Sequence, residues 1–135
     1  MGYESKIVIM DRHEYKKPNG DKWIFALEIS TFDLSKMGYE KANGHTFHDI
    51  FKTPIDFDLY IQNEDANNVY PAEYWREDCY GEHCKYTTIE NVIAWLEQSK
   101  TAKTYRRAKL LLNCLYSFRD IQNEFTQLCV VHYGY

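Results

Sequence analysis

Two pairs of metal-ligating side chains are the first feature of this sequence that could do chemistry. Four residues separate Cys79 from Cys84, and two separate His45 from His48. Together they would supply the four nitrogen and sulfur ligands of a tetrahedral zinc site. However, the pairs come from unlike segments, the His spacing is shorter than in zinc fingers, and His83 would compete as a ligand. We therefore favour two unpaired thiols in a surface loop and expect no metal or other cofactor.

Carboxylate and thiol pairs elsewhere offer two further chemistries. Asp56 and Asp58 share one side of an expected strand, which suits Mg²⁺ when more ligands are present. A solvated strand face has the same alternation, and no phosphate-binding loop accompanies it. Cys129 and His132 could act as a nucleophile and its base, but a spacing of three places them on opposite faces of a strand. Because common nucleotide-binding and hydrolase motifs are also absent, nothing in the sequence argues for an enzyme, although that class stays open.

A basic cluster surrounds Tyr105. Arg106 and Arg107 follow this tyrosine, and Lys103 and Lys109 flank it. Such a cluster can contact phosphate, but more often it forms the solvated face of a helix. The 16 basic and 20 acidic residues give a formal charge of −4, which argues against nucleic acid as a partner.

Four strands are expected to position these residues. The apolar run 7–10 and the alternating run 23–32 predict an antiparallel hairpin, with the aromatic side chains of the second strand inward. The alternating run 55–62 predicts a half-buried strand, and the apolar run 128–133 predicts a central one. Residues 63–86 predict a long connection that contains no element beyond a short hairpin around Tyr70 and Tyr74.

Two helices are expected between the third and fourth strands. Thr87 and Glu90 form a capping box for a helix that ends near Ser99, and Thr101 caps a longer helix that ends near Asn123. The predicted architecture is a single α+β domain, residues 1–135. It has an antiparallel or mixed sheet of about four strands with two helices packed on one face, in the order β-β-β-α-α-β.

The sequence also predicts the compartment. No apolar run reaches the length of a membrane span, and the N-terminus lacks the pattern of a signal peptide. We therefore expect a cytoplasmic protein that does not contact membranes and whose 4 cysteines are reduced.

Charge and aromatic residues are distributed unevenly. Residues 56–90 contain nine acidic and two basic residues, whereas residues 100–119 contain six basic and no acidic residues. The acidic and basic segments either attract each other within the fold or face water. Alternatively, the acidic segment, which is rich in the tyrosines that suit interfaces, faces a basic partner. In the last case the partner-binding residues are Asp56, Asp58, Tyr74, Trp75, Glu77, Asp78 and Tyr80.

Three short motifs resemble a family of small, uncharacterised phage and prophage proteins. They are the opening Met1–Lys6 before an apolar strand, the loop Glu77–Gly81 before a helix, and the ending Val130–Tyr135. The run Tyr105-Arg106-Arg107 is similar to the element that opens the next helix in that family. The cysteine and histidine pairs are not part of the family pattern. The resemblance implies an accessory protein that works by binding in the cytoplasm of a bacterial host.

Three functions are compatible with these observations. The first is binding of a host protein, as by an anti-defence factor such as an anti-CRISPR inhibitor. The second is binding of a nucleotide-like ligand, with Tyr80, Tyr105 and Tyr133 stacking and Arg106 or Arg107 holding phosphate. The third is an enzyme of unknown class. The sequence does not set the oligomeric state.

Overall fold

The central strand of the molecule is buried on both of its faces over residues 7–10. The structure, a computed structural model, describes residues 5–34, 40–62, 68–123 and 127–134. Strand β1 (Ser5–Lys16) lies between β2 (Lys22–Asp33) and β9 (Gln127–Gly134) and is antiparallel to both. Its side chains alternate, so Ile7 and Ile9 enter one core while Val8 and Met10 enter another.

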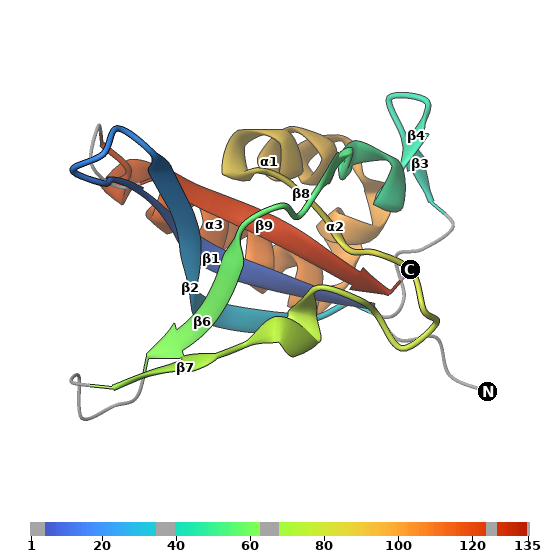
Figure 1. Ribbon diagram of the computed structural model, residues 1–135. Helices are drawn as coiled ribbons and strands as arrows, with labels where there is room; N and C mark the ends of the chain where they lie inside the picture. Colours follow the sequence, from blue (N-terminus) through green and yellow to red (C-terminus); the bar gives the residue numbers. More distant parts are fainter. Residues whose placement is uncertain (1–4, 35–39, 63–67, 124–126, 135) are drawn as a thin grey trace.

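The main sheet of the described chain has seven strands in the order β5-β8-β9-β1-β2-β6-β7 (Figure 1). Strand β6 (Asp58–Gln62) is parallel to β2, and the other neighbours are antiparallel. The remaining members are short: β5 (Thr53–Pro54), β7 (Val69–Pro71) and β8 (Lys85–Thr88). Strands β3 (Lys41–Ala42) and β4 (His45–Thr46) form a separate hairpin, and the 3₁₀ turns are η1 (His48–Ile50) and η2 (Glu73–Trp75).

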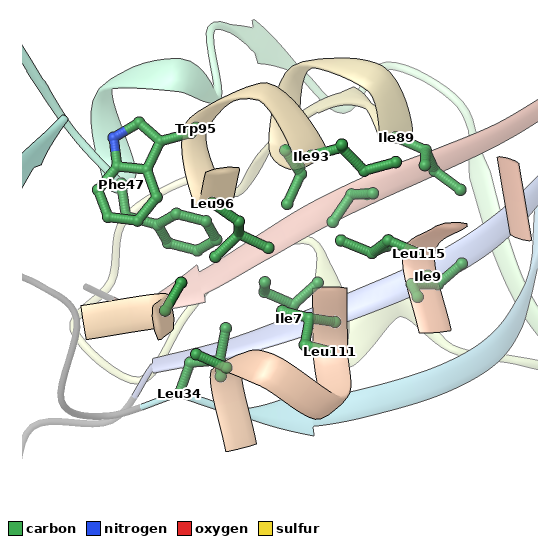
Figure 2. Packing of buried hydrophobic residues seen from close by; sticks show 14 of the residues in the cluster. Ile7, Ile9, Leu34, Phe47, Ile89, Ile93, Trp95, Leu96, Leu111 and Leu115 are labelled. Atoms are coloured by element: carbon green, nitrogen blue, oxygen red, sulfur yellow. The ribbon is translucent and has the colours of Figure 1, made fainter. Parts of the chain in front are cut away.

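Three helices follow β8 and pack on one face of the sheet. They are α1 (Ile89–Gln98), α2 (Lys100–Thr104) and α3 (Arg106–Ile121). Figure 2 shows side chains of α1 and α3 meeting Ile7 and Ile9 of β1. We call this cluster the helix-side core; its members include Ile7, Ile9, Phe47, Ile89, Ile93, Trp95, Leu96, Leu111, Leu115 and Val130.

The opposite face of the sheet carries a second core, covered by irregular segments instead of helices. Residues just before β6, around η2 and just before β8 fold across this face. We call this cluster the second core; its members are Val8, Met10, Ala26, Ile55, Phe57, Leu59, Ala72, Trp75, Cys84, Cys129 and Val131.

The predicted sheet of about four strands with two helices is wrong. The hairpin of β1 and β2 and the central position of the last strand are confirmed. The missing strands β5, β7 and β8 are two to four residues long, too short to carry a period of their own. They are strands only because longer neighbours offer them backbone partners.

The helical region also differs from its prediction. Helix α1 is capped by Thr88, whose hydroxyl accepts from the Asn91 amide at 3.2 Å, so the cap lies one residue after the predicted Thr87. The single long helix is divided at Tyr105, which has extended backbone angles (φ −84°, ψ 116°). Ser99, instead of Thr101, caps the short first part by accepting from the Ala102 amide.

The predicted inward orientation of the aromatic residues of β2 is wrong as well. The buried side of this strand carries Ala26, whereas Trp23 is 36% exposed and Phe25 is half-buried. An alternating pattern defines two sides of a strand, but it does not say which of them the rest of the chain will cover.

Glu40 fixes the start of α2 from a distant part of the chain. Its carboxylate accepts from the Ser99 hydroxyl and the Lys100 amide, both at 2.6 Å, and from the Thr101 amide at 3.1 Å. Burial raises the pKa of Glu40, but these hydrogen bonds outweigh it, and the net pKa is below the ordinary 4.5. The ionised carboxylate therefore stabilises the folded state above pH 4.5, and this stabilisation is lost as the pH falls through the lowered pKa.

We predict that Glu40→Gln lowers the free energy of unfolding at neutral pH by about 1–2 kcal/mol, since it weakens charge-assisted capping bonds. Urea denaturation at several pH values measures the effect. The difference from the native protein should shrink below pH 4.5, where Glu40 itself becomes protonated. Glu82→Gln, at an exposed glutamate, is the matched control. Equal stabilities of the Glu40 variant and the control would contradict this account.

Candidate functional site

Part of the helix-side face of the sheet has no helix over it. The last part of β1, the first part of β2 and β6 extend beyond the helices, and Figure 1 shows β6 and β7 curving away from α1. The strand registers place one set of side chains on this surface, because they pair His13 with Phe25, Phe25 with Asp58, and Leu27 with Tyr60. We call it the aromatic face; its members are Asp11, His13, Tyr15, Trp23, Phe25, Leu27, Asp58 and Tyr60.

The rings of the aromatic face form one connected cluster. The centroids of Trp23 and Phe25 are 4.5 Å apart, and the His13 ring stacks on Phe25 at 5.2 Å. Tyr60 meets Trp23 and Phe25 edge-on, at 6.3 Å from each. Tyr15, directly opposite Trp23 in the ladder, is 55% exposed. Half-exposed rings held by their neighbours offer a large contact area without much loss of side-chain freedom on binding.

Two carboxylates set the electrostatics of the aromatic face. The Trp23 indole donates to Asp58 Oδ2 at 2.8 Å, which orients that carboxylate toward the rings. Asp11 Oδ2 lies 2.9 Å from His13 Nε2, whereas Asp11 Oδ1 is buried without a hydrogen-bond partner. None of the strand positions that form this face carries Lys or Arg. Rings beside carboxylates suit a lysine or arginine side chain, which contacts the ring faces and pairs with the acid.

The partner-binding residues predicted from the sequence do not form one surface. Asp58 belongs to the aromatic face, but Trp75 is 9% exposed in the second core, on the other side of the sheet. The Trp75 indole donates to Glu28 at 2.8 Å, and the hydroxyl of exposed Tyr74 donates to the same carboxylate at 3.3 Å. Trp75 is therefore a core residue that sequence reasoning misplaced.

The other acidic members of that prediction lie in or near the loop before β8. Asp56 and Glu77 are exposed. Asp78 accepts from the amides of Tyr80 and Glu82, both at 2.9 Å, and so closes the loop on itself. Tyr80 is 45% exposed. This loop is an ordered turn whose carboxylate is used within the fold.

The residues predicted to bind a nucleotide-like ligand are also separated. Tyr105 packs against the helix-side core, whereas Tyr133 packs against the second core, where its ring meets that of Trp75 at 5.3 Å. Arg106 and Arg107 are exposed in the first turn of α3. Since the sheet separates the two tyrosines, these four residues do not line one pocket.

The combination of cysteines and histidines considered for zinc is not assembled. Cys84 is buried in the second core, and burial raises the pKa of its thiol to about 12, so it is protonated at neutral pH. His48 lies on the other side of the sheet, against His132. Within the described ranges, no group of three or more His, Cys, Asp or Glu residues is placed to hold a metal ion.

Three residues far apart in the sequence form a hydrogen-bonded chain on the helix side. Ser5 Oγ lies 2.8 Å from His132 Nε2, and His132 Nδ1 lies 2.9 Å from His48 Nδ1. Phe51 stacks on the His132 ring at 5.0 Å. This is the order of groups in a serine–histidine nucleophile relay. However, Ser5 is 1% exposed and His132 2%, so a substrate has no access to the hydroxyl, and the chain instead ties together β1, β9 and η1.

A cleft of about 410 Å³ lies between α1 and the segment from β3 to β5. Its size would admit a small molecule. Several of its polar groups are used within the protein: Asn91 donates to the Thr87 hydroxyl at 2.9 Å, and Asp49 accepts from the Thr46 amide at 3.0 Å. Hydrogen bonds from Thr46 hold the pKa of Asp49 below its usual value. The cleft is therefore a weaker candidate than the aromatic face.

Sequence reasoning missed His13 and Tyr15 as surface residues and did not include Tyr60 among the partner-binding residues. The alternation of Asp11, His13 and Tyr15 was the available signal for His13 and Tyr15, but the predicted strand ended at Met10. Tyr60 was placed on the polar side of its strand, although nothing in the sequence brings that strand next to β2.

Comparisons with known proteins add no family to this description. A scan against protein-family models and searches of curated proteins and of solved structures found no match. The motif residues 1–4 and Tyr135 lie outside the described residues. Among the helices of the described segments, none is long and apolar enough to cross a membrane.

We predict that Ser5 and His132 are energetically coupled. Ser5→Ala and His132→Phe each take away one partner of a buried hydrogen bond, whereas the double variant removes the bond from both sides. Urea denaturation of the four proteins gives the coupling energy, which we expect to be about 1–2 kcal/mol. Strictly additive losses of stability would show that the 2.8 Å contact does not contribute to folding.

Proposed function

We propose that this protein works by binding another protein, and that the aromatic face receives a lysine- or arginine-bearing segment of that partner. The observation that carries the proposal is the half-exposed cluster of Trp23, Phe25 and Tyr60 beside the carboxylate of Asp58. Aromatic anchors of this kind contribute most of the affinity in many protein interfaces. The carboxylates supply the charge that selects a basic partner.

The same face is less suited to nucleic acid. Stacked bases would fit the rings, but the phosphate backbone would meet Asp11 and Asp58 on a chain whose formal charge is −4. Carboxylates at this position repel phosphate and attract guanidinium or ammonium groups. Charge therefore favours a basic protein segment over an oligonucleotide.

The biological setting is proposed from the resemblance to phage and prophage proteins. In that setting the protein is an accessory factor in the cytoplasm of a bacterial host, and its partner is a host protein. Occupying a defence protein, as an anti-CRISPR inhibitor does, is the role that such a binding surface would serve. The nucleotide-like ligand has no comparable support, because Tyr105 and Tyr133 lie on opposite faces of the sheet.

We predict that the protein binds a fluorescein-labelled octapeptide of alternating Arg and Gly and not its counterpart of alternating Glu and Gly. Fluorescence anisotropy measures both affinities. Asp58→Asn and Tyr60→Ala should each weaken binding of the Arg peptide about three- to tenfold, the range of a surface cation–π or ion-pair contact.

Tyr74→Ala is the matched control, because Tyr74 is 56% exposed but contacts Glu28 on the other side of the sheet. It should bind like the native protein, and thermal unfolding verifies that every variant is folded. Equal binding of the two peptides, or an equal effect of the Tyr60 and Tyr74 substitutions, would overturn the proposal. A host protein captured from lysate counts as the partner only if Asp58→Asn loses it and Tyr74→Ala retains it.

A further inference from the structure

Arg12 is a half-buried arginine whose guanidinium has no acceptor among the residues that the structure describes. It lies on the second-core side of β1, with its Cζ 5.6 Å from the centroid of the Phe57 ring. Its Nε is buried and has no hydrogen-bond partner, and in the part of the chain that the structure describes the side chain forms no ion pair. A guanidinium has five N–H donors in a rigid plane. Burying one of them, the Nε–H, without an acceptor costs free energy that the fold does not recover at this position.

The Arg12 side chain faces a cavity of about 300 Å³ at the end of the sheet where β8 leads into α1 and β9 begins. Thr88 and Gln127 bring a hydroxyl and an amide to its wall, and Cys129 forms part of its base. The volume lies at the lower limit of pockets that hold small molecules. A ligand in this cavity would therefore meet the guanidinium and polar hydrogen-bonding groups together.

The acidic groups around Arg12 do not neutralise it. Glu90 lines the same cavity and accepts from Gln122 Nε2 at 3.0 Å, and in the described part of the chain it forms no ion pair with Arg12. Glu14, on the same side of β1, pairs with Lys22 at 3.4 Å, and Asp11 points to the opposite side and pairs with His13. Burial raises the pKa of the Cys129 thiol to about 12, so this neighbour is neutral. The positive charge of Arg12 thus remains available to a ligand.

The Arg12 guanidinium lies over the Phe57 ring at a cation–π distance, 5.6 Å from Cζ to the ring centroid. An aromatic ring under one face of the guanidinium leaves its N–H edges open for acceptors in the same plane. Carboxylate and phosphate groups present two oxygens at the spacing of these edges and form paired, charge-assisted hydrogen bonds. A neutral ligand would leave the charge uncompensated.

We propose that Arg12 is the centre of a binding site for a small oxyanion ligand, a molecule that bears a carboxylate or a phosphate group. The group binds the N–H edge of Arg12 inside the cavity, while Thr88 and Gln127 contact the rest of the molecule. This site is on the other side of the sheet from Asp58, so it is independent of the proposed protein-binding surface.

The test measures thermal unfolding of the full chain with millimolar inorganic phosphate, malonate or, as an ionic-strength control, chloride. Phosphate or malonate should raise the Tm of the native protein by about 2–5 °C more than chloride does, as ligand binding to the folded state requires. Phosphate alone identifies a phosphate site, malonate alone a carboxylate site, and both a general oxyanion site. No rise with either ion, relative to chloride, would overturn the proposal.

Variants separate ligand binding from a structural role of Arg12. Arg12→Met keeps much of the side-chain volume and removes the uncompensated charge, so it should raise the Tm in chloride and abolish the response to phosphate and malonate. Arg119→Lys, at an exposed arginine paired with Asp120, should respond like the native protein. An Arg12→Met protein that keeps the full response, or that has a lower Tm in chloride, would show that the guanidinium serves the fold and not a ligand.

Discussion

The length of β1 relative to the helices above it is the constraint on which the rest of this structure depends. A strand of 12 residues extends over about 40 Å, whereas the longest helix of the described chain has 16 residues and spans about 24 Å. The helices therefore cover only the first part of the strand. The sequence changes at the same place, from Ile7-Val8-Ile9-Met10, buried on both sides, to Asp11-Arg12-His13, where charge begins.

Local sequence patterns predicted the strands that are long enough to carry a hydrophobic pattern of their own. The apolar run of β1 and the alternation in β2 were enough to predict the hairpin, and the apolar run of β9 was enough to predict a central last strand. Strands β5, β7 and β8 could not be found in this way, because a few residues become a strand only beside an existing edge. The start of α2 also depends on a distant segment, because Glu40, which accepts from the Lys100 amide, is 60 residues from it in the sequence.

The candidate site was less predictable because it depends on which side of a strand is covered. Trp23 and Phe25 were recognised as one side of an alternating strand, and the opposite side proved to be the buried one. Trp75 was placed on the surface because it lies in an irregular acidic segment, yet Glu28 binds its indole from 47 residues away. Contacts of this range, like the 127 residues between Ser5 and His132, have no local signal.

In natural proteins, local propensity, core packing and the pairing of buried polar groups usually all agree with one fold, and exceptions concentrate at functional sites. Here two inconsistencies lie next to each other: a buried oxygen of Asp11 and a buried nitrogen of Arg12, each without a hydrogen-bond partner. Because neighbouring residues of a strand point to opposite faces, the negative group belongs to the aromatic face and the positive group to the cavity behind it. One pair of residues at the end of the covered part of β1 thus gives the two faces of the sheet opposite charge. A basic partner on one face and an oxyanion on the other would each bring the opposite charge next to one of these two side chains.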